Sequence, residues 1–159
     1  MTFPCPTEPT TTPLAKHHGQ RAHAALHLSS ITLFTAGTAI IQVNKHANHL
    51  PHFHSAHAYL GTATLLLLLL QYLFGFTIWA VPRVWGGEDA AKQLWKYHRW
   101  AGYGALGLLL ATVAAAAETD YVRGELKIKL WGVLVAEGLI VAGVVPRVHL
   151  RKLGVGQRG

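Results

Sequence analysis

Two histidines open apolar segments in the same local context. His57 is followed four residues later by Gly61 and then by the six leucines Leu65–Leu70. His98 is followed four residues later by Gly102 and then by a second apolar run. Imidazole is a common ligand of transition metals, and a glycine one helical turn away lies on the same helix face and leaves space beside the ring. The repeat therefore indicates a site for a bulky metal-containing group.

The composition indicates a chain whose solvent is partly lipid. Of its 159 residues, 51% are hydrophobic and 13% are charged, and the chain has eleven histidines and a net charge of +7. The basic residues lie between apolar runs, so we interpret them as topology signals and contacts for anionic lipid, and we expect no nucleic-acid partner. The single cysteine, Cys5, excludes an internal disulfide and any cysteine-based zinc or iron–sulfur site.

Four apolar segments predict an all-α fold, a multi-pass membrane bundle of four transmembrane helices. The segments are residues 23–43, 54–81, 98–117 and 130–145. About 20 helical residues span roughly 30 Å, the thickness of the hydrocarbon core. We expect residues 1–20 to form a disordered cytoplasmic tail, residues 21–150 the transmembrane domain, and residues 151–159 a basic cytoplasmic tail.

The distribution of lysine and arginine predicts the orientation. Both tails and the loop after the second segment hold ten of these residues: Lys16, Arg21, Arg83, Lys92, Lys96, Arg99, Arg147, Arg151, Lys152 and Arg158. The other side has four: Lys45, Arg123, Lys127 and Lys129. By the positive-inside rule both termini are expected in the cytoplasm.

This orientation sorts the histidines by depth. His23 and His98 open the first and third segments, so both are expected near the cytoplasmic face, whereas His57 is expected near the opposite face. A single interfacial histidine is usually only a polar residue at headgroup level, but two imidazoles at matched depth suit the axial positions of one haem. Two axial histidines leave no open coordination position, so such an iron would carry electrons. His27 lies one turn from His23, and spacing alone leaves open which of the two binds iron.

Other polar residues have two interpretations each. Four further histidines are interpreted first as loop residues and second as a small outward zinc or copper site. They are His46, His49, His52 and His54. Gln71 and Glu137 lie in the middle of their segments. A hydrogen bond between helices is the first interpretation for these two side chains, and a proton or electron path is the second.

Four stretches of the chain, in this order and spacing, resemble the cytochrome b561 family, especially its short members that consist of the core domain alone. The stretches are RAHAALH, NKHANHLPHFHSAHAYLG, LQYLFGF and YHRWAGY, and the resemblance covers residues 16–117. It implies six transmembrane helices with two b-type haems, one near each face. It also implies an oxidoreductase that passes electrons from cytoplasmic ascorbate to ferric iron or monodehydroascorbate outside.

The resemblance also assigns residues. His23, ahead of His27, falls on one ligand of the inner haem and His98 on its partner, while His57 falls on one ligand of the outer haem. Lys16 and Arg21 fall near the basic residues that family members place beside the cytoplasmic donor.

The chain departs from the family pattern in one respect. Its four helices resemble the last four of the family's six, so the helix that would supply the partner of His57 has no counterpart. One haem b, between His23 and His98, is therefore well supported. A second haem needs a ligand from a homodimer, from His52 or His54, or from a longer natural chain.

Two other functions compete with the leading one. The first is a truncated or divergent protein of this type that binds one haem or none and carries no electrons across the membrane. The second is a histidine-rich metal-binding membrane protein.

Overall fold

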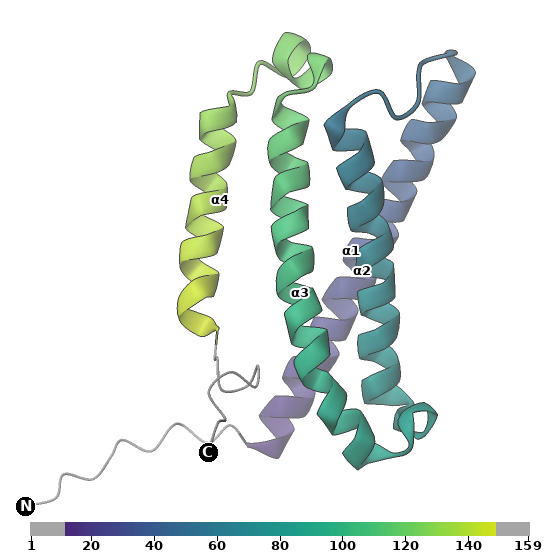
Figure 1. The fold of residues 1–159 in the computed structure, drawn as a ribbon, viewed down its shortest axis with the longest axis vertical. Helices are drawn as coiled ribbons and strands as arrows, with labels where there is room; N and C mark the ends of the chain where they lie inside the picture. The colour runs from purple at the N-terminus through teal and green to yellow at the C-terminus, as the bar shows by residue number, and fades with distance from the viewer. Residues whose placement is uncertain (1–11, 149–159) are drawn as a thin grey trace, which may run out of the picture.

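Four long helices make up the fold, in a computed structural model that describes residues 12–148 (Figure 1). They are α1 (Pro13–Ala47), α2 (Ala56–Ala80), α3 (Glu88–Ala117) and α4 (Leu130–Val144), and each runs antiparallel to the one before. Short helical turns η1 (Pro82–Trp85), η2 (Val122–Leu126) and η3 (Val145–Arg147) follow α2, α3 and α4. All four long helices, α4 with its last turn included, are long and apolar enough to cross a membrane. The predicted all-α, four-span class is confirmed, and the described residues contain no strand.

Helix α1 begins ten residues before the expected start at His23. Thr12 caps it, accepting a hydrogen bond from the Ala15 N–H over 3.3 Å, and Pro13 occupies the first turn, where its missing N–H costs nothing. Residues 13–20, which we expected to be disordered, are therefore helical. Residues 1–11 of that tail, and all of the predicted tail 151–159, lie outside the described residues.

Helix α3 also begins ten residues early, at Glu88 instead of His98. Its first turn holds Glu88 and Asp89, whose negative charges interact favourably with the helix N-terminus. Lys92 extends this polar first part and pairs with Asp89 at 2.9 Å. Hydropathy locates only the apolar part of such a helix, which is why the polar first turns were assigned to the preceding loop.

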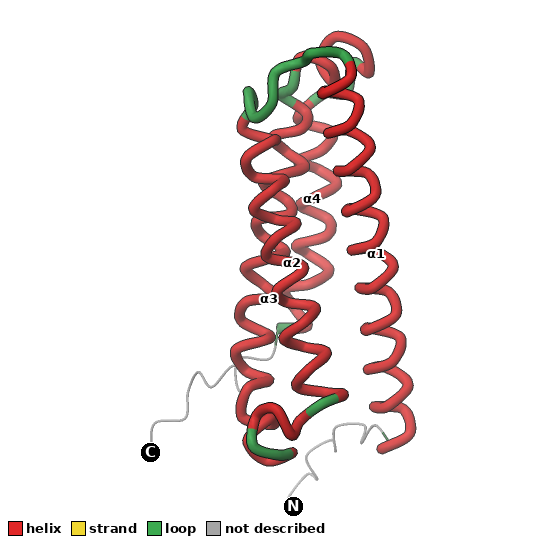
Figure 2. The backbone as a smooth tube through the Cα atoms, turned by 90° about the vertical axis from the view of Figure 1, so that its right-hand side faces the viewer, coloured by secondary structure: helices red, strands yellow, loops and turns green. Residues whose placement is uncertain are grey.

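The helices do not pack equally. α2 and α3 form the tightest pair, α1 packs on α2 and α4 on α3, whereas α1 and α3 have no close backbone contact in the described chain (Figures 1 and 2). The few buried side chains are small or of medium size: Ile31, Thr64, Gln71, Ile78, Ala91, Ala105, Thr112 and Ala117. Small side chains allow membrane helices to approach closely, so α2 and α3 form a narrow seam while α1 stands further off.

A buried hydrogen bond between two threonines crosses the α2–α3 seam. The hydroxyl oxygens of Thr64 and Thr112 are 2.8 Å apart, and Thr112 donates its own proton to the Leu108 carbonyl over 2.8 Å. Thr64 is therefore the donor of the bond between the helices. It joins the two helices in the half of the bundle where α2 begins.

We expect Thr64→Val to destabilise the bundle modestly. The substitution keeps the side-chain volume and removes the hydroxyl that donates the hydrogen bond between the helices. Such interhelical bonds in membranes contribute about 0.6 kcal/mol on average. Unfolding of the purified protein in a denaturing detergent series measures this change. A loss of unfolding free energy above about 2 kcal/mol would contradict the view that Thr64 contributes one ordinary interhelical hydrogen bond.

Candidate functional site

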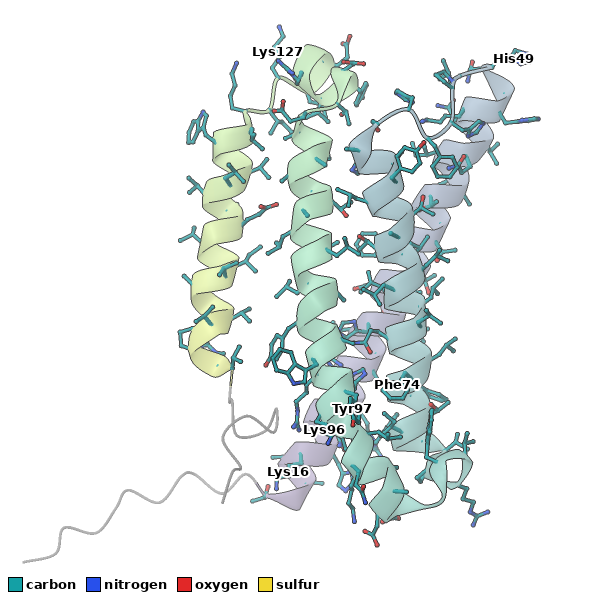
Figure 3. All side chains as sticks on the ribbon, viewed as in Figure 1. Lys16, His49, Phe74, Lys96, Tyr97 and Lys127 are labelled. Atoms are coloured by element: carbon teal, nitrogen blue, oxygen red, sulfur yellow. The ribbon has the colours of Figure 1, made fainter. Side chains whose placement is uncertain are left out.

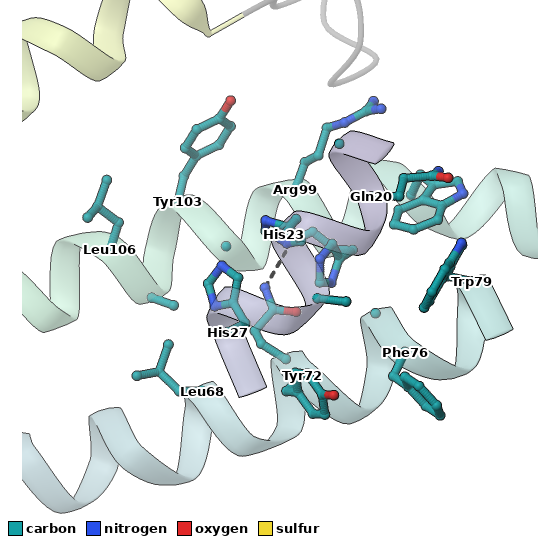
Figure 4. A pocket seen from close by; sticks show the side chains of 18 of the residues that line it. Gln20, His23, His27, Leu68, Tyr72, Phe76, Trp79, Arg99, Tyr103 and Leu106 are labelled. Atoms are coloured by element: carbon teal, nitrogen blue, oxygen red, sulfur yellow. Dashed lines mark hydrogen bonds between the residues drawn. The ribbon is translucent and has the colours of Figure 1, made fainter. Parts of the chain in front are cut away.

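A cavity of about 860 Å³ lies between α1, α2 and α3 at the end where α1 and α3 begin (Figure 4). Three histidines line it: His23 and His27 from α1 and His98 from α3. Most of the remaining lining is aromatic or aliphatic, including Tyr72, Phe76, Trp79, Trp95, Leu106 and Leu109. A largely apolar cavity of this size, with a few converging polar groups, is typical of a cofactor site.

His23 and His98 face each other across this cavity. Each lies ten residues after the first residue of its helix, so parallel α1 and α3 bring the two rings to the same depth. The ring centroids are 6.4 Å apart and the ring planes are 87° apart. An imidazole nitrogen binds a transition metal at about 2 Å, so two rings on opposite sides of one metal have centroids about 6 Å apart. The observed pair fits that spacing.

His27 lies beside His23 and not opposite His98. Its ring centroid is 4.3 Å from that of His23. Among the described residues, the aromatic partners of the His98 ring are His23, Phe74 at 6.2 Å and Trp95 at 5.7 Å. The structure therefore separates two histidines that spacing left equivalent, because His23 faces His98 and His27 lines the neighbouring wall.

Two residues of α2 contact His98 from the side. The Gln71 amide donates a hydrogen bond to the His98 main-chain carbonyl over 2.9 Å (Figure 4). A methyl group on Gly75 would lie 2.5 Å from His98 Cε1, so the His98 ring occupies the space that any other residue at position 75 would need. Gly75 was assigned no role from the sequence. In LQYLFGF this glycine stands one turn after Gln71 and thus on the same helix face.

Cationic side chains line the same cavity as the histidines. Lys16 of α1 and Arg99 of α3 contribute to its wall, whereas Arg21 does not. Lys16 lies at the same end of the molecule as Phe74, Lys96 and Tyr97, and His49 and Lys127 lie at the opposite end (Figure 3). Lysine and arginine at this position suit carboxylates or another organic anion.

These features fit haem b better than a bare metal ion. The cavity has two facing imidazoles and apolar walls for a macrocycle, and cations for its carboxylates. Nδ1 of His98 is buried and makes no hydrogen bond to any described residue. No group of three or more His, Cys, Asp or Glu side chains in residues 12–148 is placed to hold a metal ion. The four histidines at the opposite end of the bundle thus form no such group, and His52 Nδ1 instead lies 2.7 Å from Gln42 Oε1.

His57 lies at the opposite end of the bundle from His23 and His98, on the first turn of α2. Its Nδ1 is 3.0 Å from the Thr112 carbonyl. A carbonyl only accepts hydrogen bonds, so Nδ1 carries the proton and Nε2 of the neutral ring keeps its lone pair. Metal-binding histidines are usually oriented in this way by a hydrogen bond from the other ring nitrogen. His57 thus has the tautomer of an Nε2 ligand.

The two glycines of the histidine repeat have different surroundings. A methyl group on Gly61 would lie 3.7 Å from the Thr112 methyl carbon, an ordinary contact. Gly102 lines the cavity, and a methyl group there would lie 3.5 Å from Gln71 Nε2. We expected both glycines to leave space for a flat cofactor; the closest approach to a histidine ring is at Gly75 instead.

Gln71 and Glu137, the polar residues in the middle of their segments, differ in their hydrogen bonding. Gln71 makes the hydrogen bond between helices that was its first interpretation. One carboxyl oxygen of Glu137 is buried without a hydrogen-bond partner among the described residues. The Gln71 bond joins α2 to α3 at the cavity, whereas Glu137 lies on α4, which does not line it.

Comparison with known proteins connects these features to a family. Residues 7–122 match the family model described as eukaryotic cytochrome b561. The lysosomal membrane ascorbate-dependent ferrireductase CYB561A3 of Bos taurus is 32% identical over 94 residues, 58% of this chain and 34% of the bovine protein. The rat protein of the same name is 33% identical over 92 residues, 57% of this chain and 35% of the rat protein.

A second kind of relative matches less closely. The plasma membrane ascorbate-dependent reductase CYBRD1 of Xenopus laevis is 28% identical over 91 residues, 57% of this chain and 31% of the frog protein. The matched part of the chain thus spans about a third of the length of these curated relatives. No solved structure matches the chain significantly.

Proposed function

This chain belongs to the cytochrome b561 family, and from that premise we propose that it is a membrane haem b protein of the oxidoreductase type. It carries electrons from a cytoplasmic donor such as ascorbate towards an acceptor such as ferric iron or monodehydroascorbate. The names of its relatives support this proposal, since they are ascorbate-dependent reductases of the lysosomal and plasma membranes. The cavity lined by His23 and His98 supports the proposal as the place where the electron would enter.

The observation that carries the proposal is the His23–His98 pair. These two rings, 6.4 Å apart between centroids on helices without close backbone contact, would hold the haem iron from both sides. When bound, the haem supplies a one-electron iron couple. With both histidines as ligands, such an iron would have no position left for oxygen or substrate and would only exchange electrons.

The other lining residues have separate tasks in this mechanism. Tyr72, Phe76 and Trp79 of α2 form an apolar wall that would exclude water from a bound haem. Lys16 and Arg99 would hold the carboxylates of the haem or attract an anionic donor such as ascorbate. With the predicted orientation, this donor approaches from the cytoplasm.

Transfer across the whole membrane needs a second carrier near the other face. The hydrocarbon core is about 30 Å thick, so a haem at one end serves the far face poorly. His57, whose Nδ1 hydrogen bond to the Thr112 carbonyl directs its Nε2 to a ligand role, would be one ligand of that second haem. The other ligand would come from a second copy of the chain, from His52 or His54, or from a longer natural chain.

The absorption spectrum of the purified, membrane-extracted protein tests the proposal. We expect a low-spin b-type spectrum that ascorbate reduces and that His98→Ala or His23→Ala abolishes. His46→Ala, in the last turn of α1 at the far end, is the matched histidine control and should leave the spectrum unchanged. His27→Ala should keep two axial ligands if His23 is the ligand. An unchanged spectrum in His98→Ala would refute the assignment.

A divergent member with a single haem and no transmembrane transfer is the second candidate. It is favoured by one observation: no other histidine ring contacts His57 in the described chain. Transfer from ascorbate inside sealed vesicles to an impermeant ferric chelate outside separates the two functions. Ascorbate reduction of the haem without reduction of the external chelate would identify the one-haem form.

A further inference from the structure

We propose that Gln71 of α2 is a positioning residue for His98, which is a ligand supplied by a different helix. This inference rests on the proposed haem site and goes beyond it, because Gln71 itself binds neither iron nor, in this proposal, the donor. Its action would be through the His98 main chain, to which its amide donates a hydrogen bond of 2.9 Å.

Nδ1 of His98 lacks the hydrogen bond that would orient the ring, among the residues that the structure describes. Metal-binding histidines usually donate the second ring N–H to a carboxylate, carbonyl or water, which sets the ring orientation. His57 has such a bond, from Nδ1 to the Thr112 carbonyl. Nδ1 of His98 is buried and has no partner among residues 12–148. The orientation of His98 must therefore be set by packing and by its backbone.

Both of these constraints come from one face of α2. Gln71 and Gly75 are four residues apart, so they lie one above the other and face His98 together. Gly75 receives the ring edge, while Gln71 holds the carbonyl of the same residue. Phe74 and Trp95 border the ring, with centroids 6.2 and 5.7 Å away. Rotating or sliding α3 against α2 would break the Gln71 bond and move the ring off Gly75 at once.

The Gln71 bond is costly to break. Gln71 is buried, and its amide would be costly to leave unpaired in an apolar surrounding. Gly102, one turn after His98, lies beside this amide, and a methyl group there would lie 3.5 Å from Gln71 Nε2, an ordinary contact. The cost of breaking the bond is what a positioning contact requires.

The competing view is that Gln71 only holds α2 to α3. The Thr64–Thr112 bond offers a matched control, because it is another buried side-chain hydrogen bond across the same seam, at 2.8 Å, and it does not line the cavity. A purely structural role predicts the same behaviour for Gln71→Leu and Thr64→Val. A positioning role predicts an effect on the ligand in Gln71→Leu alone.

Carbon monoxide binding to the reduced haem protein measures this difference. A haem held by two firmly placed histidines binds the gas slowly, and a loosened His98 exposes the iron. We expect Gln71→Leu to bind carbon monoxide at least several-fold faster than wild type and to show an altered low-spin electron paramagnetic resonance signal. Thr64→Val should match wild type in both. Equal behaviour of Gln71→Leu and wild type, or the same change in Thr64→Val, would overturn the proposal.

A measurement without haem separates this proposal from the proposed function. In haem-free protein with labelled histidine, the His98 ring should give one set of NMR signals in wild type and Thr64→Val, and broadened or multiple signals in Gln71→Leu. If wild type takes up no haem, the proposed function fails while this comparison still decides whether Gln71 positions His98. A single unchanged His98 signal in Gln71→Leu would refute the positioning role.

Discussion

Gly75→Ala is expected to weaken haem binding more than any other single methyl group added to the bundle. The new methyl carbon would lie 2.5 Å from His98 Cε1, whereas carbon atoms in contact are about 3.5–4.0 Å apart. The ring would have to retreat by about 1 Å, and a ligand bond of about 2 Å does not tolerate such a shift. Inserting a methylene-sized group into a packed site typically costs about 1–3 kcal/mol, which corresponds to roughly a 5- to 150-fold loss of haem affinity.

Haem titration of the haem-free protein measures this loss. Gly104→Ala is the matched control, because it adds the same methyl group to a transmembrane helix at a glycine with no atom within 4 Å of the new carbon. Alanine is a better helix former than glycine, so neither change should reduce helix content, and circular dichroism verifies this. Wild-type affinity in Gly75→Ala would mean that His98 takes another position when haem binds.

The sequence was sufficient for the fold class and for the pairing of His23 with His98 at one depth. Long apolar segments predict membrane helices, and alternate helices start from the same face, so the relative depth of residues near their starts follows. His23 and His98 lie at matched depth although both helices begin ten residues earlier than expected, because the two shifts are equal. The equal depth of His23 and His98 therefore does not depend on where the two helices begin.

The sequence could not predict which face of α2 meets His98. Leu65–Leu70 make this helix apolar all around, so no periodic stripe indicates its rotation. The rotation is set by the Thr64–Thr112 and Gln71–His98 bonds, which depend on the register of α2 against α3. For this reason the role of Gly75 was not apparent, and spacing alone did not separate His23 from His27.

Haem stoichiometry is the second large effect that we expect. Protein produced from this sequence should contain about one haem per chain, since only one pair of histidine rings faces across a cavity in the described structure. His98→Ala should lower the content to near zero, whereas His57→Ala should leave it near one. Pyridine haemochrome assay against protein concentration gives these ratios directly.

The haem content of the His57→Ala variant shows whether His57 binds a haem. His57 already donates its Nδ1 proton to the Thr112 carbonyl and keeps Nε2 for a metal, so its tautomer suits a ligand whose partner is not among the described residues. If another polypeptide supplies that partner, the content should approach two haems per chain in the assembled state, whereas a second haem shared by the His57 residues of two copies should give about one and a half per chain. His57→Ala should then remove the second haem and leave the ascorbate-reducible haem in place. If two haems are present and both remain in His57→Ala, the assignment of His57 is contradicted. If a single haem is present and is lost in His57→Ala, the site lies at the His57 end of the bundle and not between His23 and His98.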